Sequence, residues 1–75
     1  MKQFIFPLHQ KTPKYKQIYE NIRQLIENGK LRTNEQLPSI RQLAETLQVS
    51  RNTTLVAYEQ LIAEGYIRSE SKRGF

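Results

Sequence analysis

The sequence predicts a mainly α-helical domain of the small α+β class, with three helices followed by a short C-terminal β-hairpin. Three observations support this fold. Apolar residues recur at three- and four-residue steps between residues 13 and 28, two capped helical segments follow, and a strand-like run succeeds Gly65. The chain has 75 residues, which fits one domain. A domain of this size buries about 60% of its unfolded surface, so we expect modest stability.

Residues 1–12 form a predicted N-terminal arm, in which Pro7 interrupts an apolar run. Two interpretations are open: the arm packs on the core or a neighbouring domain, or its lysines contact DNA. The first helix is expected over residues 13–28, with Thr12 as its cap and Pro13 in its first turn. Gly29 is expected to end this helix. Its apolar stripe is predicted to be core and comprises Tyr15, Ile18, Tyr19, Ile22, Leu25 and Ile26.

A polar connection over residues 31–36 leads to the second helix, which begins at Pro38 or Ser39 and ends near Leu47. Ser50 is the expected N-cap of a third helix over residues 51–64, and Gly65 ends it. Residues 66–70 are predicted to form a strand and residues 71–74 a turn. Phe75 would begin a returning strand, so the hairpin lacks an arm and we expect the chain to be a fragment of a longer protein.

The second and third helices have the spacing of a helix-turn-helix motif. Two short helices joined by about three residues must cross steeply, and Ala44 supplies the small residue that the close approach needs. Gln48 occupies the turn position where glycine is common. A left-handed backbone there costs a non-glycine residue about 1 kcal/mol, which is tolerable. Residues 13–75 are thus predicted to form a winged helix-turn-helix domain.

The third helix has one face for the core and one for a partner. A rotation of 100° per residue turns Thr54, Ala57, Tyr58 and Leu61 inward and Asn52, Leu55, Val56 and Glu59 outward. In such a motif the N-terminal residues of this helix enter the major groove of DNA. We expect Arg51 to contact guanine or phosphate and Asn52 an adenine edge. Thr53 lies on the flank of the same turn.

Exposed apolar residues on this helix leave two hypotheses open. Leu55 and Val56 are expected to touch thymine methyl groups in a DNA complex. The alternative is a protein-interaction winged helix that docks through Leu55 and Val56. The salt dependence of binding distinguishes the two, because DNA binding weakens log-linearly with salt. Non-specific RNA binding is a third interpretation, but the tyrosines are assigned to the core, which leaves no exposed aromatic platform.

Further cations flank the predicted groove-binding helix. Arg41, at the start of the second helix, is placed to reach a backbone phosphate, with Ser39 nearby. Lys72, Arg73 and Gly74 form a basic hairpin tip that suits a wing at the minor groove. The 12 Lys and Arg against 7 Asp and Glu give a net charge of +5, which favours a polyanionic partner.

Four blocks of sequence resemble the DNA-binding domain of GntR-family regulators. They are LPSIRQLA at residues 37–44, VSRNT at 49–53, AYEQL at 57–61 and EGYI at 64–67. The ending KRGF at 72–75 is most similar to the MocR/GabR branch. The resemblance covers residues 13–75.

The resemblance implies that Arg41, Arg51, Asn52, Thr53 and Gly74 meet DNA, and the motif adds Ser50 at the start of the third helix. Leu55 departs from the wider family, which often has arginine there. The resemblance also implies a homodimeric full-length regulator with a C-terminal effector domain. In the MocR/GabR branch that domain resembles a fold-type I aminotransferase and binds pyridoxal phosphate, for which this chain has no room.

Several other functions are not expected. His9 is the single histidine, cysteine is absent, and no glycine-rich phosphate loop is present, so we predict neither an enzyme nor a metal site. No apolar run approaches the roughly 20 residues of a membrane helix. No cofactor is expected in this chain. Double-stranded DNA is the expected partner, and the expected location is the cytoplasm, on the nucleoid.

Overall fold

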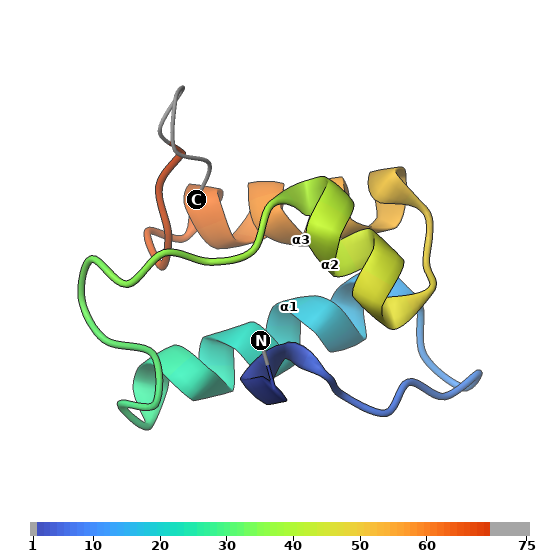
Figure 1. Ribbon diagram of the computed structural model, residues 1–75, viewed down its shortest axis with the longest axis horizontal. Helices are drawn as coiled ribbons and strands as arrows, with labels where there is room; N and C mark the ends of the chain where they lie inside the picture. The colour runs from blue at the N-terminus through green and yellow to red at the C-terminus, as the bar shows by residue number, and fades with distance from the viewer. Residues whose placement is uncertain (1, 70–75) are drawn as a thin grey trace.

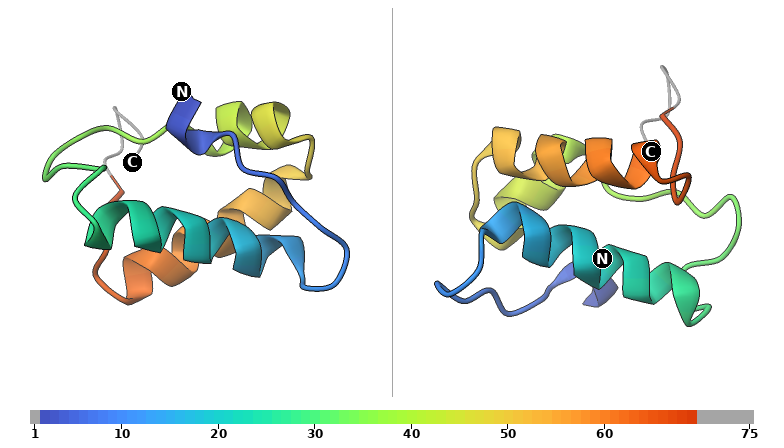
Figure 2. Two further views of the ribbon diagram at one scale, coloured as in Figure 1. Left: turned by 90° about the horizontal axis from the view of Figure 1, so that it is seen from below. Right: turned by 180° about the vertical axis from the view of Figure 1, so that it is seen from behind.

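The computed structural model describes residues 2–69 and contains three α-helices and one 3-10 turn within them. The elements follow the order η1 (Lys2–Phe4), α1 (Lys14–Glu27), α2 (Ile40–Leu47) and α3 (Arg51–Ala63). Helices α2 and α3 lie on one side of α1, and α1 and α3 cross at an angle (Figures 1 and 2). The three predicted helices are therefore confirmed, with bounds that differ by one or two residues.

The core lies between the three helices. Apolar burial is the main force that holds such a small domain together. Tyr58 of α3 is fully buried at its centre and donates its hydroxyl proton to the carbonyl oxygen of Pro38, at 2.7 Å. The buried apolar cluster comprises Phe4, Ile18, Ile22, Leu31, Leu37, Leu43, Ala57, Tyr58 and Leu61.

The N-terminal arm packs against this core. Phe4 is 3% exposed, and Phe6 and Leu8 lie against the buried cluster. Gln17 of α1 fixes the end of the arm, since its amide accepts from the His9 N–H at 3.0 Å and donates to the His9 and Thr12 carbonyls at 2.8 and 2.7 Å. The hydrogen bonds explain why this polar side chain is buried. Figure 2 shows η1 on the same side of the α1–α3 pair as α2.

Two expectations about the start of α1 are wrong. Pro13, not Thr12, is the N-cap, and its ψ of 137° keeps it extended, so the helix begins at Lys14 without a side-chain cap. The carbonyl of Thr12 is instead bonded to Gln17. Tyr15 is 41% exposed and does not belong to the core, because it lies beside an open hollow between α1 and α3.

Helix α2 begins with a complete capping box. Ser39 Oγ accepts from the Gln42 N–H and Gln42 Oε1 accepts from the Ser39 N–H, both at 3.0 Å. At the other end Gln48 adopts a left-handed backbone, with φ 57° and ψ 47°, as the turn predicted. The N–H of Val49 then bonds to the Ala44 carbonyl at 3.0 Å, which closes the turn toward α3.

The strand predicted for residues 66–70 is not confirmed, since the described residues include no strand. A strand is stable only when a neighbour accepts its backbone hydrogen bonds, and no partner strand lies within residues 2–69. The exit segment of residues 66–69 is held by side chains: Tyr66 Oη donates to Glu27 at 2.9 Å and Arg68 donates to Asn34 at 3.4 Å. The predicted wing residues Lys72, Arg73 and Gly74 lie outside the described residues.

Within residues 2–69, no helix combines the length and the hydropathy that a bilayer span needs.

Candidate nucleic-acid interface

The N-terminal turn of α3 faces outward. Ser50 caps it, with Oγ 3.0 Å from the Thr53 N–H and 2.7 Å from Thr53 Oγ1. Arg51 and Asn52, the first two helical residues, are exposed. Their backbone N–H groups have no acceptor inside the helix, so this end carries partial positive charge. The turn therefore suits an anionic partner.

The rest of α3 divides into two faces, as the periodicity predicted. Thr54, Ala57, Tyr58 and Leu61 have no exposed surface. On the outer side Leu55 is 37% exposed, Val56 is half-buried and Glu59 is exposed. The core contacts of α3 with α1 and α2 hold this outer face in place.

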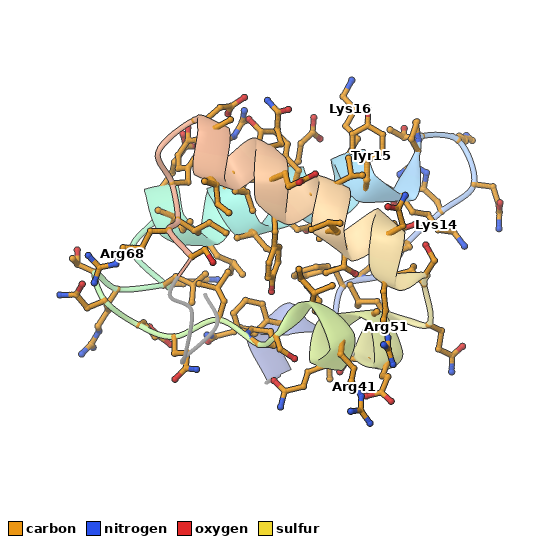
Figure 3. The ribbon with its side chains drawn as sticks, turned by 90° about the horizontal axis from the view of Figure 1, so that it is seen from above. Lys14, Tyr15, Lys16, Arg41, Arg51 and Arg68 are labelled. Atoms are coloured by element: carbon orange, nitrogen blue, oxygen red, sulfur yellow. The ribbon has the colours of Figure 1, made fainter. Side chains whose placement is uncertain are left out.

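Arginines lie on the α2 side of α3. Figure 3 shows Arg51 extending from the start of α3 toward the side on which Arg41 of α2 lies. Arg41 Nε is 3.8 Å from Glu45 Oε1, and both side chains are about two-thirds exposed, at 69% and 67%. An exposed pair of this kind contributes at most about 1 kcal/mol. Arg41 can therefore exchange Glu45 for a phosphate at little cost.

Ser39 and Ser50 lie at the starts of α2 and α3, as expected, but their hydroxyl oxygens are occupied as helix caps. Ser39 Oγ accepts from Gln42 N, which leaves its O–H proton available to a phosphate oxygen. Ser50 Oγ is also paired with Thr53 Oγ1. Thr53 is half-buried, so this pair lies at the edge of the exposed turn.

Lysines at the start of α1 form a second basic edge, which the sequence analysis did not assign to the interface. Lys14, Tyr15 and Lys16 are exposed, and Figure 3 shows Tyr15 and Lys16 on the opposite side of α3 from Arg41. Tyr15 and Lys16 line a hollow of about 200 Å³ together with Tyr19 and Gln60, so this edge adjoins α3. The clue in the sequence was the absence of any acidic residue before Glu20.

A cluster of polar side chains on α1 contacts the C-terminal end of α3. Glu64, at the end of α3, accepts from the Tyr19 hydroxyl. This hydrogen bond lowers the pKa of the Glu64 carboxyl and raises the pKa of Tyr19. Arg23 lies over the Tyr19 ring, 5.5 Å from its centroid, and its Nε is 3.8 Å from Glu27 Oε1. These contacts join the end of α3 to the middle of α1 and contribute no group to the exposed N-terminal turn.

Among residues 2–69, no group of three or more His, Cys, Asp and Glu side chains is arranged to bind a metal ion. His9 accepts a backbone hydrogen bond from Lys11 at its Nδ1, at 3.3 Å. What the described residues offer is an exposed helix start between two basic edges, on a three-helix scaffold with a tight turn. That combination defines a helix-turn-helix DNA-binding domain.

Comparison with known proteins gives the family. Residues 14–75 match the model of bacterial regulatory proteins of the gntR family. The chain is 45% identical over 63 residues to a probable rhizopine catabolism regulatory protein, MocR, of Rhizobium meliloti, covering 84% of this chain and 13% of that protein. It is 43% identical over 58 residues to the vitamin B6 salvage pathway transcriptional repressor PtsJ of Salmonella typhimurium, covering 77% and 14%.

Comparison with a solved structure indicates the same family. YtrA from Sulfolobus acidocaldarius, a GntR-family transcription factor, superposes with a TM-score of 0.83 at 44% identity, over 93% of this chain and 76% of that one. The chain therefore belongs to the GntR family and is the DNA-binding helix-turn-helix domain of a transcription regulator. The predicted likeness to MocR is confirmed, and these findings favour DNA binding over docking through Leu55 and Val56. The chain spans about one seventh of the length of MocR and PtsJ.

Proposed function

We propose that the chain recognises an operator in double-stranded DNA by inserting the N-terminal half of α3 into the major groove. The exposed start of α3 between two basic edges carries the proposal. An α-helix with its side chains is about 10–12 Å wide, and the major groove is about 12 Å wide, so α3 fills the groove. Arg51, Asn52 and Thr53 then meet base edges and the nearest phosphates.

The two edges contact the two DNA strands. Arg41 and Ser39, on the α2 side, bind phosphates of one strand, while Lys14 and Lys16, on the α1 side, bind phosphates of the other. Ser50 keeps the first turn of α3 in shape. Glu59 marks the limit of insertion, because its exposed carboxylate repels the phosphate backbone. We extend the interface to Lys72, Arg73 and Gly74, as a wing at the minor groove.

The regulator as a whole is proposed to act as a homodimer on two half-sites, in the cytoplasm and on the nucleoid, without catalysis by this domain. The relatives extend far beyond the matched segment. Dimerisation, effector binding and the pyridoxal phosphate expected for the MocR branch are assigned to a segment outside this chain. One domain on one half-site then binds weakly, because the avidity of two linked domains is missing.

Replacement of Arg51 tests the proposal. We expect Arg51→Ala to weaken binding of a selected duplex by about 1–3 kcal/mol and to leave the thermal unfolding midpoint unchanged, because Arg51 is exposed. Fluorescence anisotropy gives the affinity and circular dichroism the unfolding. Arg32→Ala is the matched control, since it removes the same charge from the exposed loop between α1 and α2, at the other end of the molecule (Figure 1). An equal loss in both variants, or none in either, contradicts the role of α3.

A further inference from the structure

Two aliphatic side chains on the outer side of α3 have no partner in the core. Leu55 is 37% exposed and Val56 is half-buried, and both lie in the N-terminal half of the helix. Neither side chain donates or accepts hydrogen bonds, so neither recognises the polar edge of a base. An exposed leucine at the edge of a polar interface contributes to binding only when it contacts an apolar group.

The surroundings of the pair indicate what that group belongs to. Arg51 and Asn52 lie about one helical turn before Leu55, Arg41 and Lys16 lie on opposite sides of α3, and Lys14 is exposed at the start of α1. Within residues 2–69 neither Lys14 nor Lys16 takes part in an ion pair. An apolar protein partner would have to desolvate these cations, whereas the phosphates of a duplex neutralise them. Charge complementarity therefore favours DNA as the occupant of this face.

The major groove of DNA offers one apolar group to such side chains, the C5-methyl of thymine. Asn52 and Leu55 are three residues apart, so they share a face of α3 and lie about 4.5 Å apart along its axis. Neighbouring base pairs are about 3.4 Å apart. Leu55 is thus placed over the base pair next to the one that Asn52 contacts.

We propose that Leu55, supported by Val56, recognises a thymine methyl group in each operator half-site, one base pair from the base that Asn52 contacts. This inference rests on the proposed function and adds a base identity to it. It makes Leu55 a specificity-determining residue.

Uracil substitution in the duplex tests the contact. A duplex is first selected from random sequences with the 75-residue chain, and each thymine is then replaced singly by uracil, which removes only the methyl group. The loss of one buried methyl predicts binding about fourfold weaker at one or two positions of the half-site. In Leu55→Ala the same replacements should change the affinity less than about 1.5-fold, because the partner of the methyl is gone.

The helix offers a matched control. Ile62, also 37% exposed, lies two turns further along α3, beyond Glu59. Ile62→Ala should keep the full sensitivity to uracil. Both leucine and isoleucine are replaced by the strongest helix former, so we expect both variants to fold.

Three results separate the possible failures. No uracil effect on wild-type binding, or an effect that persists in Leu55→Ala, overturns the methyl contact and leaves DNA binding intact. Loss of sensitivity in Ile62→Ala also overturns it, because the effect would then not depend on position. Failure of the wild-type chain to enrich any duplex, even at protein concentrations chosen for the weak binding of a single domain, contradicts the proposed function itself and with it the methyl contact.

Discussion

Gln48 forms the turn between α2 and α3 at a backbone conformation that disfavours its own side chain. Its φ of 57° and ψ of 47° lie in the left-handed region, where the Cβ atom approaches the following carbonyl oxygen. The closing hydrogen bond from Val49 N to Ala44 O, at 3.0 Å, depends on this conformation. The strain is therefore local and serves to fix the angle between α2 and α3.

Gln48→Gly should raise the free energy of unfolding by about 0.5–1 kcal/mol. Relief of about 1–2 kcal/mol of left-handed strain is partly offset by the greater freedom of glycine in the unfolded chain. Chemical denaturation with urea measures the change. Gln48→Ala is the control, because alanine keeps the Cβ atom and should leave the stability within about 0.5 kcal/mol of wild type. An equal gain in both variants would show that the glutamine side chain, not the backbone, is the source.

The elements of the fold were predictable where their ends are set by local chemistry. Ser39 and Ser50 cap α2 and α3 through the backbone of the residue three positions on, and Gly29 and Gly65 both have a φ near 80° just after α1 and α3. These contacts join residues that are close in sequence, so they can be predicted from the sequence alone.

Other features depend on contacts between distant parts of the chain, and the sequence did not predict them. Gln17 is buried because the arm passes over it at His9, eight residues earlier, and Tyr15 is exposed because α3 leaves it beside an open hollow. At the interface, periodicity correctly placed the outer face of α3. It did not show that Lys14 and Lys16 flank the same helix, since that depends on how α1 and α3 pack.

The basic edge at the start of α1 predicts how strongly DNA binding depends on salt. We expect the double variant Lys14→Gln/Lys16→Gln to reduce the slope of log K against log salt by about 1.8, because each lost phosphate contact removes about 0.9. Anisotropy titrations between about 50 and 200 mM salt measure the slope. Lys30→Gln is the control and should leave the slope unchanged, because Lys30 is exposed in the loop that follows the C-terminal end of α1. Equal slopes for the double variant and wild type would restrict the interface to α2 and α3.

At the scale of the whole molecule, two tyrosine–carboxylate pairs at the surface connect α1 to the end of α3 and to the exit segment. Tyr19 donates to Glu64, and Tyr66 donates to Glu27 at 2.9 Å. The first pair connects the two helices directly, and the second connects the exit segment to the end of α1. Together they hold the end of α3 and the exit segment against α1, while the start of α3 remains exposed.

These pairs predict how stability depends on pH. The Tyr19 hydrogen bond lowers the pKa of Glu64 in the folded protein, and a backbone hydrogen bond from Arg32 lowers the pKa of Glu35. Below their ordinary pKa of 4.5 the unfolded chain binds more protons than the folded one, so stability falls as the pH drops through the folded values. Glu64 raises the pKa of Tyr19 and burial raises that of Tyr58, so stability also falls as the pH rises above 10.

Tyr19→Phe should remove the Glu64 part of the acid sensitivity. Without the donated hydrogen bond the Glu64 carboxyl moves toward its ordinary pKa, and the difference in urea midpoint between pH 7 and pH 3 becomes smaller than in wild type. Glu35 keeps its own contribution, so part of the difference persists. Tyr15→Phe is the matched control, because Tyr15 is exposed and lies one turn earlier on α1. An unchanged acid dependence in Tyr19→Phe would mean that the Tyr19–Glu64 contact does not stabilise the packing of α3 on α1 in solution.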